Sequence, residues 1–321
     1  MRNKTLILVL IGEAILCAIA ALILNYDNAG YLTVMQFPFA QIGMLLRGLS
    51  LSGGLGNVAA FIVYVAICTV PIVFVAVHMR KKTFKAEDGL LVVMSGFGFY
   101  MMYMMINPAL LGQTPVFFKQ DFGKAILGGA LYAILIGYLV LKILRRAEHS
   151  KTDSLLKILR LLIAITAIVI VFGISYMGIG DVKMKLAAIQ SGNTDPSVSL
   201  SFTNFFVVVS YILTQMPAAT QIVIFLLAMQ LCDDLRVDKF GEGAINAAKK
   251  LAVFCKIAVV VTMLSCIVIN LAQIVFAGSL VSVDYNTILP LDSILVALTA
   301  LLLTRFFIAS SELSQDNKMF I

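Results

Sequence analysis

Eight long runs of apolar residues constrain the fold of this chain more than any other feature of its sequence. Each run is long enough to cross a hydrocarbon core about 30 Å thick as a helix, which takes roughly 20 residues. Because a backbone in lipid must satisfy its own hydrogen bonds, a helix is the expected form of each run. The sequence therefore predicts an all-α, polytopic membrane helical bundle with about eight transmembrane helices. The runs lie near residues 5–25, 54–78, 88–107, 122–143, 158–178, 202–230, 251–279 and 290–311.

The composition of the chain points to the same class of protein. Of the 321 residues, 61% are hydrophobic and 13% are charged, and the mean hydropathy is +1.00. A soluble protein of this size cannot bury so much apolar surface, so the lipid bilayer is the expected partner. Another membrane or cytoplasmic subunit is a further candidate partner. The net charge of +7 fits the Lys and Arg that gather in cytoplasmic loops of membrane proteins, and we expect no nucleic-acid partner.

Lys and Arg indicate which side of the membrane each loop faces. With the N-terminus placed in the cytoplasm, 19 of the 24 Lys and Arg residues fall on the cytoplasmic side. Most of these lie in three loops, at residues 80–85, 142–160 and 233–250. The positive-inside rule therefore predicts that both termini are cytoplasmic.

The segment at residues 36–50 is apolar, yet it makes a poor transmembrane helix. It contains Pro38, Gln41 and Arg47, and an Arg in the middle of a membrane costs roughly 2.5–3.5 kcal/mol. Its apolar side chains recur at helical spacing on one face. We expect a helix at the outer interface or a re-entrant helix. The alternative is a ninth span, which would place the N-terminus outside.

The predicted spans divide into two groups of four. The joint between them is the polar run RRAEHSKTDS at residues 145–154. We therefore predict one four-span half at residues 1–150, which carries the outer interfacial helix, and a second four-span half at residues 151–321. Each half has one longer outer loop, at residues 26–53 and at residues 179–201.

Two consecutive spans carry polar side chains at helical spacing. Pro217 lies near the middle of the first of these spans, where it removes a backbone donor. The two faces predict an intramembrane polar seam, which is either a set of interhelical hydrogen bonds or a ligand or ion path beside a broken helix. The residues of this seam are Thr214, Pro217, Gln221, Thr262, Cys266, Asn270 and Gln273.

One carboxylate falls well inside a predicted span. Glu13 lies in the first span, and Lys256 and Arg305 enter later spans from the same side. A buried carboxylate needs a partner or a proton. We expect Glu13 to pair with Lys256 or Arg305, or to be protonated, and to act either in a structural bridge or in a relay of protons or cations.

The sequence lacks the patterns of catalytic, cofactor and metal sites. It has no phosphate-binding Gly loop before Lys-Ser/Thr, no His-Cys-carboxylate cluster with metal spacing and no nucleophile with a base signature. We therefore predict no catalytic residue, no cofactor and no metal. The five cysteines are odd in number and lie in or beside apolar runs, so no disulfide framework is expected. The four methionines at residues 99–111 are expected to pack between helices, with a Cu(I)–thioether site as the alternative.

The last part of the chain contains several short features that can be compared with a known family. Phe240 follows a short polar turn, a basic helix with Lys249 and Lys250 leads into a span, and the tail contains Asp316, Asn317 and Ile321. In these features residues 158–321 resemble a bacterial four-span membrane family, domain-of-unknown-function family 2975. Lys318 stands where that family has an acidic residue. The resemblance implies a bacterial plasma membrane and brings no established activity with it.

Two classes of function follow from these features. The polar seam with its proline favours a permease-like component of a transport system. The small loops and the basic cytoplasmic face favour a non-transporting membrane sensor, immunity or regulatory protein. An intramembrane enzyme is a third class, which we do not predict.

Overall fold

The chain is mostly helical in the part that the structure describes. In this computed structural model eight of the described helices are long and apolar enough to cross a membrane, and no strand is present among the described residues. The predicted all-α polytopic membrane bundle is therefore confirmed. The described residues are 3–23, 29–113, 120–148, 152–195, 197–239, 241–281 and 289–319.

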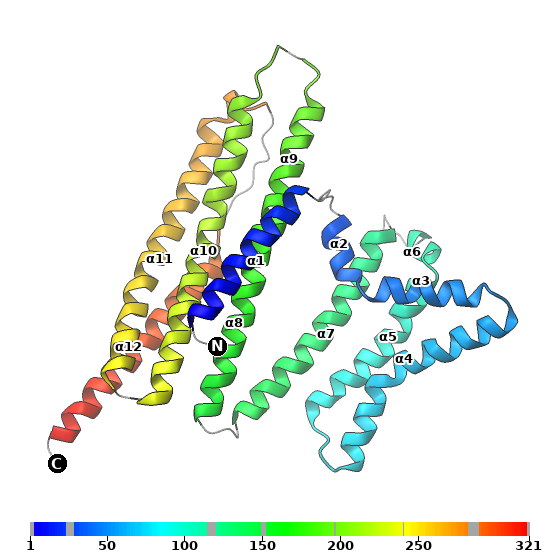
Figure 1. Cartoon of the computed structure of the whole chain (residues 1–321), viewed down its shortest axis with the longest axis horizontal. Coiled ribbons are helices and arrows are strands. Elements are labelled where there is room, and N and C mark those ends of the chain that lie inside the picture. The colour runs from blue at the N-terminus through cyan, green and yellow to red at the C-terminus, as the bar shows by residue number, and fades with distance from the viewer. Residues whose placement is uncertain are drawn as a thin grey trace. The chain divides into compact units, whose positions relative to one another are not determined.

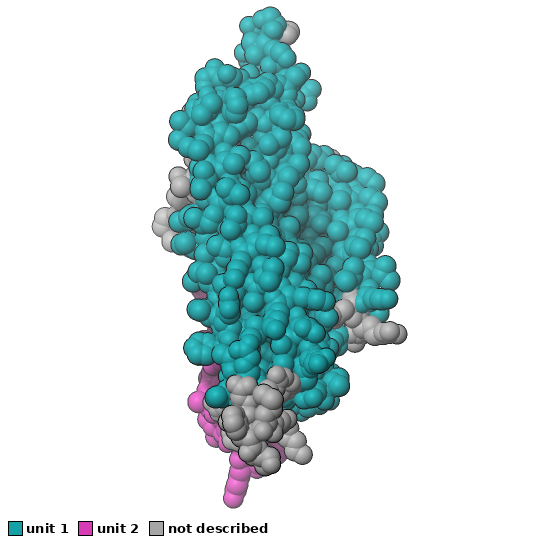
Figure 2. Space-filling view, turned by 90° about the vertical axis from the view of Figure 1, so that its left-hand side faces the viewer, with its two compact units in different colours: residues 1–27, 151–321 teal, residues 28–150 magenta. Residues whose placement is uncertain are grey.

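The chain forms two compact units, coloured separately in Figure 2. Unit 1 contains residues 1–27 and 151–321, and unit 2 contains residues 28–150. The division at the polar joint is close to the one expected from sequence. The first span differs, because it belongs to the same unit as residues 151–321.

Unit 1 is a bundle of long helices in which sequential neighbours pack together. The helix α10 contacts α8 and α11, and α11 contacts α12 (Figure 1). The N-terminal helix α1 packs against α8, η2, α9 and α10. The elements are α1 (Asn3–Ile23), α8 (Thr152–Phe172), the π-helical segment η2 (Gly173–Gly178), α9 (Ile179–Gly192), α10 (Ser201–Val237), α11 (Glu242–Val275), η3 (Ala277–Ser279) and α12 (Leu291–Met319).

One helical stretch of unit 1 is about twice as long as a hydrocarbon core is thick. The helix runs through α8, η2 and α9 for 41 residues, or about 62 Å at 1.5 Å per residue. A hydrocarbon core spans about 30 Å, so part of this helix extends beyond it. The first part of the predicted outer loop at 179–201 is therefore helical and forms α9. The charges of Asp181, Lys183 and Lys185 make this segment polar without preventing a helix.

Small side chains bring α11 close to its neighbours. Ala248, Cys255 and Ala258 of α11 are each at most 1% exposed. Cys255 and Ala258 form a buried cluster with Ile224 of α10 and Ala297 of α12. Membrane helices gain most from such close contacts, because lipid tails are as apolar as the side chains themselves.

Ion pairs join the first turns of α8 to the last turns of α10. Arg236 Nε lies 2.6 Å from Asp153 Oδ1, and Arg160 Nε lies 3.1 Å from Asp233 Oδ1. The basic loops that precede α8 and follow α10 therefore emerge at the same end of unit 1, as the distribution of Lys and Arg predicts.

Unit 2 contains three candidate spans and several short helices. The spans α4, α5 and α7 pack in sequence, α2 packs on α7, and α3 packs on α4 and α5. The elements are α2 (Ala29–Gln36), α3 (Phe39–Ser50), α4 (Gly54–Arg80), η1 (Ala86–Asp88), α5 (Gly89–Ile106), α6 (Ala109–Gln113) and α7 (Gln120–Glu148).

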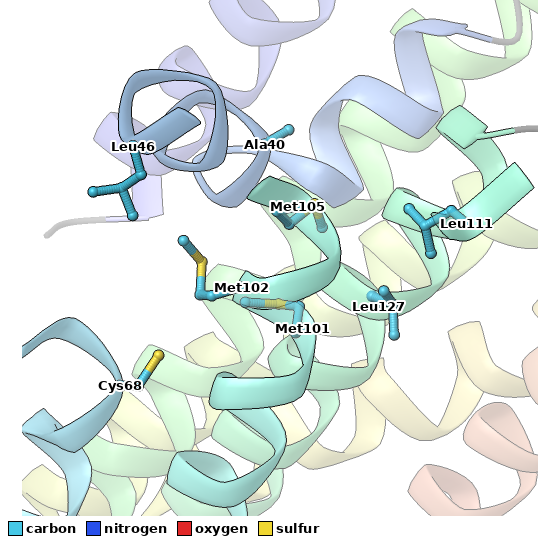
Figure 3. Close-up of a cluster of buried hydrophobic side chains, with 8 residues drawn as sticks. All are labelled: Ala40, Leu46, Cys68, Met101, Met102, Met105, Leu111 and Leu127. Carbon is cyan, nitrogen blue, oxygen red and sulfur yellow. The ribbon is translucent and has the colours of Figure 1, made fainter. Parts of the chain in front are cut away.

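The core of unit 2 is rich in sulfur. Met101, Met102 and Met105 of α5 are each at most 2% exposed, and they cluster with Cys68 of α4 and Leu127 of α7 (Figure 3). The methionines of the 99–111 run thus occupy the helix interface, where an unbranched and polarisable side chain fills irregular gaps well.

The segment at 36–50 is a short helix beside the ends of two spans. The helix α3 has 12 residues, which is too few to cross a bilayer. It approaches α5 so closely that an added Cβ at Gly43 would lie 2.7 Å from Met105 Cβ. Arg47 Nη1 donates a hydrogen bond of 3.1 Å to the carbonyl oxygen of Ile106, the last residue of α5. Arg47, whose charge makes a transmembrane span unfavourable here, therefore lies at the carbonyl end of α5, where positive charge is favoured.

Candidate intramembrane polar site

The predicted polar seam lies in the helix pair of α10 and α11, which pack against each other. Gln221, Thr262 and Gln273 are buried at 6%, 2% and 9% exposure, and Pro217 and Cys266 are also buried. The side chains of Thr214 and Asn270 are half-buried. The helix α10 continues without a break from Ser201 to Val237, so the alternative of a broken helix at Pro217 is wrong.

Several polar groups of the seam are satisfied within their own helix. Thr214 Oγ1 donates to the carbonyl oxygen of Ser210 at 2.7 Å, one turn earlier in α10. Asn270 Nδ2 lies 3.4 Å from Cys266 Sγ, one turn earlier in α11. Because these polar groups are hydrogen-bonded within their own helices, they do not need water as a partner. The seam is therefore suited to close packing of the two helices.

Glu13 lies within the first candidate span, as predicted, but not in the predicted ion pair. Leu6 and Leu10 of α1 pack in a buried cluster with residues of α8 and α10, and Glu13 follows them on the same helical face. Lys256 and Arg305 are exposed, and α1 packs on α8, η2, α9 and α10. Within the described residues no salt bridge reaches Glu13, so the pairing with Lys256 or Arg305 is wrong. The seven-residue seam and these three charges do not form one site.

Two contacts fix the height of Glu13 along its neighbours. Near its start, α1 packs beside Ala167 and Val171 of α8. Near its end, Lys183 Nζ of α9 donates to the carbonyl oxygen of Leu22 at 2.7 Å. Glu13 lies between these contacts, and α1 packs on η2 along the same stretch. The carboxyl group is therefore at the level of the π-helical segment.

The π-helical segment is bound to α10 by a tyrosine. Tyr211 Oη donates to the carbonyl oxygen of Ile174 at 2.7 Å. Its ring lies so close to Gly178 that an added Cβ there would be 2.6 Å from Tyr211 Cε2. Ser175 of the same segment is buried. A π-helical segment alters the regular carbonyl pattern of an α-helix and often marks a functional site.

Two buried oxygens in this region lack a hydrogen-bond partner among the described residues. They are Oε2 of Glu13 and Oγ of Ser210, which precedes Tyr211. Buried polar atoms without a partner are costly and are usually explained by a water, an ion or a functional role. Because α1 packs on η2 and on α10, and Tyr211 of α10 is bonded to η2, we refer to Glu13, Ser175, Ser210, Tyr211 and the η2 backbone together as the carboxyl site.

The sequence alone identified one member of the carboxyl site, Glu13. It gave no sign of η2, because a π-helical turn has no strong composition signal. Ser210 and Tyr211 are polar residues in an apolar run. Tyr is common near membrane interfaces, so the sequence does not mark these two residues as members of a site.

The side chains of the carboxyl site offer oxygen atoms as ligands. Among the described residues, no three His, Cys, Asp or Glu side chains are grouped to hold a metal ion. A carboxyl group, three hydroxyls and a backbone carbonyl are oxygen groups, which suit a proton or a hard cation.

No protein-family model, curated protein or solved structure matches this chain. The resemblance of residues 158–321 to domain-of-unknown-function family 2975 therefore stays a prediction. Of its motif positions, Phe240 and Ile321 lie outside the described residues, whereas Lys249 and Lys250 lie in α11.

Proposed function

We propose that this integral membrane protein is a permease-like component of a transport system and that Glu13 carries a proton or a monovalent cation. The observation that supports this proposal is the position of the carboxyl group, which lies within a candidate span with Oε2 buried and without a hydrogen-bond partner among the described residues. Ionisable groups inside a membrane are rare, because they are expensive, and they typically mark ion or proton paths.

The surroundings of Glu13 support a movable proton or cation more than a fixed structural charge. A permanent bridge would need a basic partner beside the carboxylate, and Lys256 and Arg305 are exposed on other helices. The hydroxyls of Ser175, Ser210 and Tyr211 provide oxygen atoms at a similar height in unit 1. Loss or gain of a proton at Glu13 then changes the charge of the site.

We place the protein in the plasma membrane of a bacterium, with both termini in the cytoplasm. The membrane is an implication of the family resemblance, and the orientation follows from the distribution of Lys and Arg. Another membrane or cytoplasmic subunit would complete a transport system of this kind.

Proton movement through reconstituted protein tests the proposal. The full chain is placed in liposomes that contain the pH dye pyranine, and a potassium potential is imposed with valinomycin. We expect a faster dye response than in protein-free liposomes, and Glu13→Gln should reduce that response at least tenfold. Glu312→Gln removes an exposed carboxylate of α12 and should leave it unchanged. Equal responses from Glu13→Gln and wild type, or from wild type and empty liposomes, would contradict the proposal.

The second candidate is a non-transporting sensor, immunity or regulatory protein. The observation that favours it is the burial of Gln221 in α10 and of Thr262 and Gln273 in α11, two helices that pack together, which supports a packed seam rather than an open path. Absence of any ion flux in the liposome experiment would favour this class.

A further inference from the structure

A cavity in unit 2 brings four sulfur-containing side chains together in the middle of the candidate spans. Its volume is about 190 Å³, and it is bordered by Cys68 and Pro71 of α4 and by Met94, Gly98, Met101 and Met102 of α5. These residues lie near the midpoints of α4 and α5. The cavity is therefore far from both ends of its helices.

The spacing of residues on α5 creates this space. Met94, Gly98, Met101 and Met102 are related by i, i+4, i+7 and i+8, so they share one face of the helix. Gly98 is buried, and a Cβ added to it would meet no atom within 4 Å. The missing side chain at Gly98 thus leaves room beside three thioethers.

Cys68 is held against the same face from the neighbouring helix. Ser95 Oγ, which is 0% exposed, donates a hydrogen bond of 2.5 Å to the carbonyl oxygen of Cys68. Figure 3 shows Cys68 directed from α4 toward the part of α5 that carries Met101 and Met102. Cys68 is 3% exposed, and Met101 and Met102 are each 1% exposed.

We propose that this cavity is a binding site for a soft monovalent cation, Cu(I), with the Cys68 thiolate and the thioethers of Met94, Met101 and Met102 as ligands. Thiolate and thioether sulfur are the donors that select Cu(I) over hard cations. When Cu⁺ binds, the Cys68 thiol loses its proton and a Cu–S bond forms, so one proton is released for each cation bound. No electron is transferred.

Charge favours a monovalent over a divalent cation in this cavity. One thiolate and one Cu⁺ form a neutral pair, and the thioethers add no charge. A divalent ion such as Zn²⁺ would leave one uncompensated positive charge in the hydrocarbon region, where charge is expensive. The site is therefore expected to prefer Cu(I), and Ag(I) as its redox-inert analogue, over Zn²⁺.

Competition for Cu(I) tests this site. The purified full chain in detergent is mixed anaerobically with Cu(I) and the chelator bathocuproine disulfonate, and the bound metal is measured from the loss of the coloured chelate. We expect one Cu(I) per chain. Cys68→Ser should weaken binding at least tenfold, and Met101→Leu and Met102→Leu, which keep the side-chain volume, should each weaken it about three- to tenfold.

The matched controls are Cys255→Ser and Met229→Leu, which change a buried thiol and a buried thioether of unit 1. Both should bind Cu(I) like the wild type, and each variant is first checked for a wild-type helical circular dichroism spectrum. Binding that is absent in wild type, that survives Cys68→Ser, or that falls equally in the controls would overturn the proposal. The site rests on contacts within unit 2 alone, so its test is independent of Glu13 and of proton movement.

Discussion

Arg145 and Glu87 are 58 residues apart in sequence, yet Arg145 Nη1 lies 2.8 Å from Glu87 Oε1 and 2.6 Å from Glu87 Oε2. This ion pair joins η1, which follows the basic loop at 80–85, to the last turns of α7. The two basic segments of unit 2 therefore emerge at the same end of the unit. The distribution of Lys and Arg likewise predicts that these two segments lie on the same side of the membrane.

The first prediction concerns the strength of this ion pair. The Glu87 side chain is 10% exposed, so Glu87→Gln removes a charge from a partly desolvated pair and should lower the free energy of unfolding by roughly 1 kcal/mol. Asp121→Asn is the control, because Asp121 pairs with Lys124 while 65% exposed and should change stability less. Thermal unfolding followed by circular dichroism measures both, since the chain has no Trp for fluorescence. Equal effects in the two variants would argue against a special role for Glu87.

The second prediction tests the packing of α3 against α5. Gly43→Ala introduces a Cβ that would lie 2.7–2.9 Å from Met105, including backbone atoms, so the helices must move apart at a cost of roughly 1–3 kcal/mol. Gly48→Ala in the same helix meets nothing within 4 Å and should be neutral or stabilising, because Ala favours a helix over Gly by about 1 kcal/mol. If both variants melt at the same temperature, α3 does not pack on α5 as described.

The third prediction links the π-helical segment to activity. Gly178→Ala would push a Cβ to 2.6 Å from the Tyr211 ring and so disturb the bond from Tyr211 to the Ile174 carbonyl. We expect a lower melting temperature and a reduced proton flux in pyranine liposomes. Gly173→Ala meets nothing within 4 Å and should retain both properties. A Gly178→Ala variant with wild-type proton flux would show that η2 is not needed for proton movement at the carboxyl site.

The fourth prediction concerns the orientation of the chain in the membrane. Lys81 follows α4 and Ser191 lies near the end of α9, and both are exposed. A membrane-impermeant thiol reagent added to intact cells should label Ser191→Cys and spare Lys81→Cys until the cells are permeabilised. Native thiols give little background, since Cys68, Cys232, Cys255 and Cys266 are buried and Cys17 is half-buried. Labelling of both sites from outside would refute the eight-span topology with cytoplasmic termini.

The sequence predicts the spans well because a segment that crosses lipid must be apolar and long enough to span the hydrocarbon core as a helix. An apolar run of sufficient length can be recognised without knowledge of its neighbours. The same logic identified α3, because Arg47 and Pro38 are costly in a span. The sequence does not predict the helix α9 for a related reason. Its charged residues indicate that this segment lies outside the hydrocarbon core, but nothing in the sequence distinguishes a loop there from a helix that continues into water.

Contacts between helices were harder to predict from the sequence. No local signal in the sequence shows that α1 belongs with unit 1, so the sequence predicts the wrong partner for Glu13. The methionine run was visible, but its meeting with Cys68 depends on how α4 packs on α5. Pro217 left two alternatives open in the sequence, and the structure shows that α10 continues through it.

The most direct measurement of the central claim is chemical modification of Glu13 in liposomes. A carboxyl group that lies in hydrocarbon and binds protons reacts with the lipid-soluble dicyclohexylcarbodiimide and is shielded from a water-soluble carbodiimide. We predict that peptide mass spectrometry will find the dicyclohexyl adduct on Glu13, and that the water-soluble reagent will modify the exposed Glu312 instead. Modification of Glu13 by the water-soluble reagent alone, or by neither reagent, would contradict the account.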